Sequence, residues 1–281
     1  MTCVASLLCA LIAAGPAEYL DYGRRPSFAA RGSIVLDAAG IPRVRYPGRR
    51  RPVYNPVTVA QHGLQQLSYF VLTGSRTHLR RAVRAARWFE QTQDRRTGKW
   101  LYRFRWRVVR TRLTLRTPWA SAMAQGQAMS LLARVYLATG ERHYLAAAAR
   151  AMRPLLRSVR RGGLVARLHG RPWYEEYPTS PPSFVLNGFM FTLLGLHDVG
   201  SVRSSSEAHA LYRRGLQTLV ASLPLYDTPA GSLYHLADRR YVAPLRYQRL
   251  HVKLLSALLA ISPEPELRRY RNRWRRFGTA S

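Results

Sequence analysis

Apolar residues gather in four stretches that each have the length of a helix. The stretches run from Val57 to Leu72, Ser121 to Leu137, Ser183 to Val199 and Tyr247 to Ile261. The third stretch is apolar on nearly every side, which is typical of a helix buried in a core. Each stretch precedes a segment with one charged face; the first such segment carries Arg80, Arg81, Arg84 and Arg87. The pattern predicts inner helices that alternate with outer ones.

A short motif repeats between the first two helix pairs. Residues 71–79 (VLTGSRTHL) align with residues 137–145 (LATGERHYL), so the first two inner helices end at glycine turns. Weaker copies pair residues 183–199 with 207–223, and 251–261 with 264–277. Such self-similarity indicates stacked helical hairpins. We predict a mainly α fold: an (α/α) toroid-like array over residues 51–281, with short β-hairpins in its rim loops. An arm over residues 1–50 precedes it, apolar at first and then irregular with one β-hairpin.

The long connections of such an array fall at one end. They lead into the inner helices and cover residues 46–56, 99–118, 161–182 and 228–246, whereas the turns at the other end are short. Two of them, within residues 100–115 and 233–242, have the pattern of β-hairpins. Long loops on one rim of a rigid scaffold predict a binding cleft at that rim.

The charge of the chain narrows the class of its partner. Its 45 Lys and Arg residues against 14 Asp and Glu residues give a net charge of +31. A field of this sign attracts polyanions such as nucleic acid, anionic lipid or acidic polysaccharide. No nucleic-acid-binding motif accompanies the charge, so we do not predict a specific nucleic-acid partner.

The sequence predicts no metal or disulfide site. Its two cysteines, Cys3 and Cys9, stand alone and its eight histidines are scattered, so no ligand cluster is predicted. Both cysteines fall in Met1–Ala14, an apolar run that ends in small residues like a signal peptide but precedes the first basic residue, Arg24. The run is too short to span a bilayer, and no transmembrane span is predicted. A signal peptide, a buried helix and a shifted start remain open, and with them a cytoplasmic or cell-envelope location.

The stretch from Arg171 to His197, RPWYEEYPTSPPSFVLNGFMFTLLGLH, holds the densest candidate chemistry. It puts two carboxylates and two phenols beside each other, among prolines, before a buried helix. In a structural interpretation, the aromatic side chains plug a helix end and the glutamates pair with arginines. In a chemical interpretation, the neighbouring rim loops contribute further phenols and arginines. Phenols, carboxylates and arginines without metal ligands then suggest an acidic carbohydrate as the ligand.

Four segments resemble the C-terminal region of the D-glucuronyl C5-epimerases. They are YNPVTVAQHGL (54–64), PWASAMAQGQAMSLLARVYLATG (118–140), WYEEYPTSPPSFVLNGFMFTLLGLHD (173–198) and LPLYDTPAGSLYHL (223–236). The resemblance spans roughly residues 40–262 in the same order. It implies an isomerase that inverts C5 of glucuronate to iduronate in an acidic polysaccharide, as in heparan sulfate biosynthesis. It also implies proton removal and return by tyrosines, without a cofactor.

The resemblance implies roles for particular residues. The catalytic group would be Glu176, Tyr177, Tyr234 and Tyr247, and Asn187 matches an asparagine near the substrate. A phenol with a pKa of about 10 must lose roughly three units to act as a base near neutrality, which requires about 4 kcal/mol. Nearby guanidinium groups and the N-termini of inner helices could supply this stabilisation. The other substrate-binding candidates are Glu175, Arg116, Arg239, Arg240, Arg246, Tyr54, Trp119 and His251. For Tyr54, Trp119 and His251, a structural role is the alternative.

The chain also departs from the family pattern. Ala237 stands where the family has an arginine that contacts substrate, and Arg239, Arg240 or Arg246 could replace that arginine. The segment before Tyr247 is shorter than in the family. Animal enzymes carry a β-barrel domain that helps them form dimers, and residues 1–50 are too few to hold it, which leaves a homodimer open. A uronate polysaccharide lyase and a non-catalytic polyanion-binding protein remain the alternatives to an epimerase.

Overall fold

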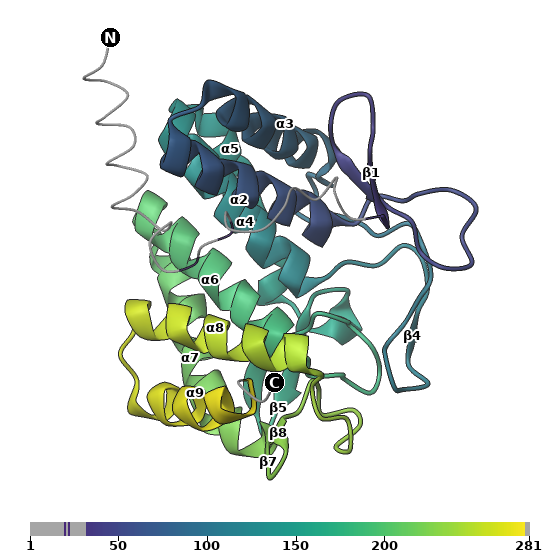
Figure 1. The fold of residues 1–281 in the computed structure, drawn as a ribbon, viewed down its shortest axis with the longest axis vertical. Coiled ribbons are helices and arrows are strands. Elements are labelled where there is room, and N and C mark those ends of the chain that lie inside the picture. The colour runs from purple at the N-terminus through teal and green to yellow at the C-terminus, as the bar shows by residue number, and fades with distance from the viewer. Residues whose placement is uncertain (1–19, 21, 23–31, 279–281) are drawn as a thin grey trace.

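The computed structural model describes Leu20, Tyr22 and residues 32–278. Met1–Ala14, with Cys3 and Cys9, lies outside these residues. Four helical hairpins follow one another along the molecule (Figure 1). They are α2 (Pro56–Thr73) with α3 (Arg76–Thr92), α4 (Ala122–Thr139) with α5 (Arg142–Arg150), α6 (Leu186–Arg203) with α7 (Ser206–Tyr226), and α8 (Leu245–Ile261) with α9 (Pro265–Gly278). This arrangement confirms the predicted stack of helical hairpins.

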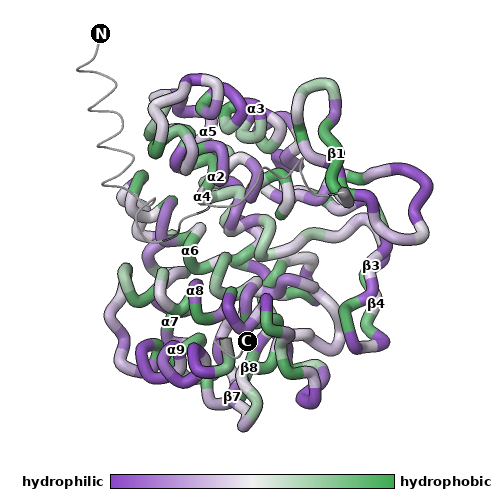
Figure 2. Tube along the Cα trace, in the orientation of Figure 1, coloured by the Kyte–Doolittle hydropathy of each residue, from purple (hydrophilic) through white to green (hydrophobic). Residues whose placement is uncertain are grey.

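The first helix of each pair forms the inner layer. Helix α4 packs against α2 and α6, and α6 packs in turn against α8. Helices α4 and α6 are buried on nearly all sides, whereas hydrophilic residues dominate α9 in Figure 2. Glycine allows α4 and α6 to approach closely, because a Cβ at Gly126 would lie 2.6 Å from the Phe191 carbonyl oxygen. A buried ion pair of 3.2 Å between Arg134 and Asp198 also joins the two helices. The inner layer is therefore a rigid scaffold.

The helix ends follow local sequence signals. Asn55 caps α2 by accepting a hydrogen bond from the Val57 N–H, and Pro56 occupies the first turn. Ser121 caps α4 in the same way. Both helices end at glycines in the left-handed conformation, Gly74 with a φ of +67° and Gly140 with +73°. The repeated glycine turns of the sequence are thus repeated helix C-caps.

In the described residues, four antiparallel β-hairpins accompany the helical array. They are β1 (Ile34–Leu36) with β2 (Pro42–Val44), β3 (Trp106–Arg107) with β4 (Thr114–Leu115), β5 (Val165–Leu168) with β6 (Arg171–Tyr174), and β7 (Asp227–Thr228) with β8 (Gly231–Ser232). The hairpins expected in the arm and within residues 100–115 are present. The region 233–242 forms only a bridge between Leu233 and Val242. Two short 3-10 helices, Arg153–Leu156 and Val159–Arg161, precede β5.

Strand β6 was not expected, because among the long connections only residues 100–115 and 233–242 had the pattern of a β-hairpin. Its Pro172 pairs with Arg167 in a two-stranded ribbon, where a residue without an N–H is tolerated because the outer edge needs no donor. In Figure 1 the hairpins β1–β2 and β3–β4 lie on the right, beside the N-terminal ends of the inner helices. Within the described part of the chain, no helix is both long and apolar enough to cross a membrane.

Candidate active site

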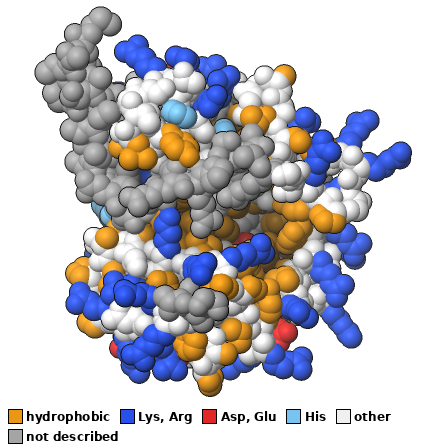
Figure 3. Space-filling view, viewed as in Figure 1, with side chains coloured by type: hydrophobic (Ala, Val, Ile, Leu, Met, Phe, Trp, Pro, Cys, Tyr) orange, Lys and Arg blue, Asp and Glu red, His pale blue; other side chains and the backbone are white. Residues whose placement is uncertain are grey.

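A cavity of about 310 Å³ opens where the four inner helices begin. The helices contribute Val57 and Gln61 of α2, Met123 of α4, Asn187 of α6, and Tyr247 and Leu250 of α8, together with the N-caps Asn55 and Ser121. Loops and hairpins add Tyr46, Tyr102, Phe104, Trp106, Trp119, Glu176, Tyr177 and Tyr234. Figure 3 shows a hollow with hydrophobic side chains between the upper and lower helix pairs. One site thus collects residues from both halves of the array.

Six of the residues singled out in the sequence meet in this cavity. They are Trp119, Glu176, Tyr177, Asn187, Tyr234 and Tyr247. Trp119 is 7% exposed, stacks on Tyr102 with ring centroids 3.9 Å apart, and donates its indole N–H to the Phe104 carbonyl. It therefore forms a fixed wall of the cavity.

The four candidate acid–base groups are neighbours in the cavity. Glu176 and Tyr234 both lie close enough to Tyr177 to influence its ionisation. The Tyr234 and Tyr247 rings lie 4.7 Å apart, edge to face. The cavity therefore holds one carboxyl and three phenols side by side.

Glu176 is the buried carboxyl of this cluster. Its side chain packs against Gly188 in the first turn of α6, where an added Cβ would lie 2.6 Å from the Glu176 Cβ. Its Oε2 has no hydrogen-bond partner among the described residues. Burial raises the pKa of Glu176 to about 7, while hydrogen bonding from Tyr177 acts in the opposite direction. This carboxyl can therefore gain and lose a proton near neutrality.

The tyrosines do not have the lowered pKa values that the sequence suggested for a free phenolate. Burial, and then the neighbouring Glu176, raise the pKa values of Tyr177 and Tyr234 well above 10. The guanidinium groups expected beside them do not line the cavity within the described chain. Arg246 comes near, with its guanidinium 4.8 Å from the centre of the Tyr247 ring. The phenols of the cavity are therefore protonated at neutral pH.

The positive character of the cavity comes from helix ends. Helices α2, α4, α6 and α8 all present residues of their N-termini to it, and a helix N-terminus carries a partial positive charge of about half a unit. Helices α6 and α8 start without a side-chain cap, unlike α2 and α4. Asn187 is buried there with an Oδ1 that has no partner in the described chain. The cavity therefore suits an anion that also donates hydrogen bonds.

Metal ligands do not gather in the described residues. No group of three or more His, Cys, Asp or Glu side chains that could hold a metal ion occurs in this part of the chain.

The comparisons with known proteins identify the family of the chain. The family described as "D-glucuronyl C5-epimerase C-terminus" matches residues 93–276. The chain belongs to this family. The D-glucuronyl C5-epimerase of Caenorhabditis elegans is 35% identical over 210 residues, which cover 68% of this chain and 33% of that protein. An uncharacterized protein of Methanocaldococcus jannaschii is 29% identical over 180 residues, or 63% of this chain and 56% of that one. The chain thus spans about a third to a half of these relatives.

Solved structures share the fold. A structure described as UGL with dGlcA-Glc-Rha-Glc has a TM-score of 0.52 at 12% identity, covering 79% of this chain and 60% of that one. A family 76 glycoside hydrolase from a bovine Bacteroides thetaiotaomicron strain has a TM-score of 0.53 at 13% identity. The match covers 84% of this chain and 50% of that one. At such identities the likeness concerns the fold alone, and it supports the (α/α) toroid-like assignment of this C5-epimerase family member.

Glu175 turns away from the cavity. Its carboxylate accepts hydrogen bonds from the Ser183 hydroxyl at 2.8 Å and from the Phe184 N–H at 3.1 Å. These bonds close the loop that carries Tyr177, between β6 and α6. The hydrogen bonds lower the pKa of Glu175, but burial outweighs them and raises it to about 8. Of the two adjacent glutamates, Glu175 braces the loop and Glu176 faces the cavity.

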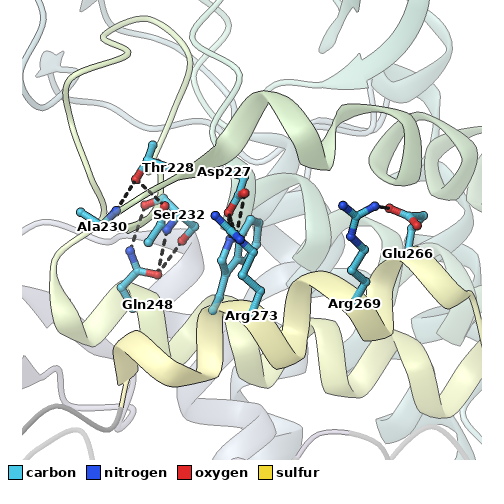
Figure 4. Close-up of polar contacts among 10 residues, drawn as sticks. Asp227, Thr228, Ala230, Ser232, Gln248, Glu266, Arg269 and Arg273 are labelled. Atoms are coloured by element: carbon cyan, nitrogen blue, oxygen red, sulfur yellow. Dashed lines mark hydrogen bonds and ion pairs between the residues drawn. The ribbon is translucent and has the colours of Figure 1, made fainter.

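His251 and Tyr54 also have partners outside the cavity. His251 is buried with its Nδ1 2.7 Å from the Ser232 hydroxyl, and burial lowers its pKa to about 3. Gln248 on the same helix holds Ser232 as well, and Asp227 receives hydrogen bonds from Arg273 and Trp274 of α9 (Figure 4). These contacts fix the β7–β8 hairpin just before Tyr234. Tyr54 is 38% exposed and donates a 2.6 Å hydrogen bond to Asp37.

The candidate arginines lie outside the cavity. Arg116 and Arg246 are exposed, and Arg240 is 95% exposed and pairs with Asp238 at 3.6 Å. Arg239 lies with Arg112 and Ala237 around a separate surface hollow of about 470 Å³. The residues expected to replace the family arginine therefore surround the site without entering it.

The sequence assigned no role in the site to some of the lining residues. Asn55 was recognisable as a helix cap before Pro56, and Tyr102 and Trp106 as alternate positions of the hairpin region 100–115. Tyr46 had no signal of its own, since it follows β2 in the arm and meets the cavity only in three dimensions. Gln61, in the second turn of α2, also lines the cavity.

Proposed function

We propose that the chain inverts C5 of D-glucuronate residues to L-iduronate in an acidic polysaccharide, without a redox cofactor. The observation that carries the proposal is the convergence of Glu176 and three phenols on one cavity at the N-termini of four helices. Membership of the C5-epimerase family supports the reaction class. Because the chain covers only part of its curated relatives, the activity and the substrate remain proposals.

Glu176 and Tyr177 act together as the base. The base takes the proton at C5, and the electron pair of the C5–H bond moves into the adjacent uronate carboxylate. Tyr177, whose phenol is protonated, accepts the C5 proton as it passes its own proton to Glu176. A carboxylate with a pKa of about 7 suits this role near neutrality. This relay removes the need for a resting phenolate.

The helix ends stabilise the charge that develops. Proton removal leaves a second negative charge on the uronate carboxylate, and preorganised donors lower the energy of such a state. The uncapped N-terminus of α6 and the Asn187 side chain lie in the same cavity as Glu176. The Asn187 Nδ2 has only a weak partner, the Met123 sulfur at 3.9 Å, so it is available to a carboxylate.

An arginine-lined hollow of about 620 Å³ supports an acidic polymer as the substrate. Arg49, Arg105, Arg107 and Arg112 surround it together with Thr114. None of these arginines forms an ion pair with an acidic side chain of the described residues. Figure 3 shows Lys and Arg side chains projecting along the same side of the molecule as the β3–β4 hairpin. Phe104 and Trp106, the alternate residues of the hairpin, line the cavity. A polymer bound in the cavity would therefore pass close to these guanidinium groups.

The proposal is tested by incubation with glucuronan or heparosan in deuterated water. We expect deuterium at C5 together with iduronate signals in the NMR spectrum, and a loss of at least 100-fold in Glu176→Gln. Ultraviolet absorbance from an unsaturated uronate would replace the proposal with a lyase. Binding without exchange or elimination would replace it with a non-catalytic glycan-binding protein.

A further inference from the structure

The β3–β4 hairpin carries aromatic residues of the cavity and arginines of the hollow beside it. Phe104 and Trp106 line the cavity, and Arg105 and Arg107 line the hollow. The ribbon itself is short, because β3 and β4 pair over only two residues each. A two-stranded ribbon of this size has little stability of its own. The position of the hairpin beside the cavity must therefore be set by contacts with other parts of the chain.

A hydrogen bond between distant segments holds the tip of the hairpin. The Val109 carbonyl lies 2.9 Å from the Nε2 of His235, 126 residues further along the chain. Among the described residues, no other hydrogen bond or ion pair joins residues 107–113 to a segment outside the hairpin. His235 directly follows Tyr234, which lines the cavity. The His235–Val109 bond therefore joins the hairpin to the segment that carries a candidate acid–base group.

The surroundings of His235 determine which of its ring nitrogens donates. The Asp238 nitrogen lies 3.2 Å from the His235 Nδ1, and a backbone N–H can only donate, so Nδ1 is the acceptor. The ring is fully buried and burial lowers its pKa, so the neutral form predominates at neutral pH. The ring proton is then on Nε2, which donates to the Val109 carbonyl. The bond thus has one defined direction.

Both ends of this bond belong to ordered backbone. His235 pairs with Val185 in an antiparallel bridge just before α6. At the tip of the hairpin, the Val108 N–H donates to the Leu113 carbonyl at 2.9 Å, and Val108 is fully buried. A bond between two ordered segments fixes their relative position at little further cost in conformational entropy.

We propose that His235 is a positioning residue, which holds the β3–β4 hairpin against the segment that carries Tyr234 and so places the hairpin arginines for an acidic polymer. The inference rests on the proposed function, because the polymer is the proposed substrate. With the bond formed, a polymer meets Arg105, Arg107 and Tyr234 in a fixed arrangement. Without the bond, the polymer must order the hairpin as it binds, which weakens binding.

The bond should affect binding more than the chemical step. Tyr234 is held by a separate contact, because its carbonyl accepts from the Leu186 N–H at 3.1 Å in the first turn of α6. Loss of the hydrogen bond at the hairpin tip leaves this contact in place. A change in KM with little change in kcat is therefore the expected signature of the positioning role.

Two amides at position 235 separate the bond to Val109 from the other roles of the histidine. In His235→Asn, the side-chain oxygen can accept from the Asp238 N–H, but the amide is too short to reach Val109. In His235→Gln, the amide nitrogen takes the place of Nε2. We expect KM for heparosan to rise about 3- to 10-fold in His235→Asn, as for the loss of one hydrogen bond, and kcat to stay within about twofold. His235→Gln should restore KM, and His143→Asn, at an exposed histidine of α5, is the matched control without effect.

Trypsin reports the position of the hairpin without reference to activity. Arg110 and Arg112 are exposed at its tip, and cleavage after them requires local opening of the hairpin. Mass spectrometry of a limited digest should show these cuts about 3- to 10-fold faster in His235→Asn, with cuts in α3 and α9 unchanged. In His235→Gln the rate should match that of the unmodified protein.

Several outcomes would contradict the inference. Equal cleavage of the hairpin in His235→Asn and in the unmodified protein would overturn it, as would a loss confined to kcat. Faster cleavage in α3 and α9 as well would show that His235 only supports the fold. Absence of C5 exchange in the unmodified protein would instead overturn the proposed function, while the digest still decides whether His235 holds the hairpin.

Discussion

The two ends of the helical array are built differently. At the short-turn end, threonine side chains satisfy carbonyls of the last helical turns: the Thr73 and Thr139 hydroxyls donate to the carbonyls of Tyr69 and Val135, at 2.6 and 2.8 Å. At the other end, Glu176 Oε2, Asn187 Oδ1 and Trp106 Nε1 are buried without partners in the described chain. Buried polar atoms without partners cost free energy, about 1–3 kcal/mol each.

The comparison indicates which property separates the end with the candidate site from the short-turn end. Arginines occur at both ends, for example on α3 at the short-turn end and on the β3–β4 hairpin at the other. Charge alone therefore does not distinguish the two. The difference is the cavity at the long-loop end. Helix N-termini and buried polar atoms without partners in the described chain line this cavity. Three predictions test this difference, from the largest expected effect to the smallest.

Gly188→Ala should disable the cavity end of α6. The new methyl group would collide with the Glu176 carboxylate and Cβ, so the carboxyl must move away from Tyr177. Epimerisation is expected to fall about 100-fold, the usual contribution of a positioned acid–base group. Alanine favours helix over glycine by about 1 kcal/mol, so the helix content should not fall. Circular dichroism and the exchange assay measure both quantities.

A double-mutant cycle identifies the cause of that loss. If Gly188→Ala acts by displacing Glu176, the variant should cost nothing further in a Glu176→Gln background. Additive losses in the double variant would mean that Gly188 affects the site by another route, such as the approach of substrate to the α6 N-terminus.

The pH profile of exchange should follow Glu176. Burial raises the pKa of this carboxyl to about 7, and the base must be deprotonated, so kcat/KM should rise with pH up to about 7 and level above it. Below this value it should fall about tenfold per pH unit, because one proton blocks the base. The profile should stay flat from there to at least pH 9, since burial raises the pKa values of Tyr177 and Tyr234 well above 10 and keeps both phenols protonated. A flat profile between pH 5 and 8 would exclude Glu176 as the base.

The arginines of the two ends should differ in their effect on a polymer. Arg105→Gln with Arg107→Gln removes two charges from the hollow beside the cavity. Arg81→Gln with Arg84→Gln removes two from the exposed face of α3, so net charge changes equally. Only the first pair should weaken polymer binding, about 2- to 30-fold, at 0.2–1 kcal/mol for each exposed contact. Equal losses in isothermal titration would indicate that total charge, and not the hollow, attracts the polymer.

Much of this organisation was predictable because its causes are local in the sequence. The apolar pattern of residues 121–137, the glycines at 74 and 140 and the loop lengths sufficed for the helical hairpins and for the rim that carries the site. The structural interpretation of the stretch from Arg171 to His197 holds for Trp173, which stacks on Phe189 at 3.9 Å with no exposed surface. The family resemblance also named Glu176, Tyr177, Tyr234 and Tyr247, which line one cavity.

Sequence reasoning was less successful where the direction of a side chain matters. Glu175 and Glu176 are adjacent and chemically identical, yet one binds Ser183 and Phe184 while the other enters the cavity. Arg239, Arg240 and Arg246 are close to the site along the chain and remain outside it. Tyr46 belongs to an arm that carries no recognisable motif.

The sequence by itself determined the helical repeat, the end of the array where the long loops gather and the family of the chain, because periodicity, caps and motifs act over a few residues. The tertiary structure alone decided which polar groups share the cavity and how they ionise. Burial depends on segments far apart in the chain, and burial is what raises the pKa of Glu176 to about 7 and keeps the surrounding phenols protonated.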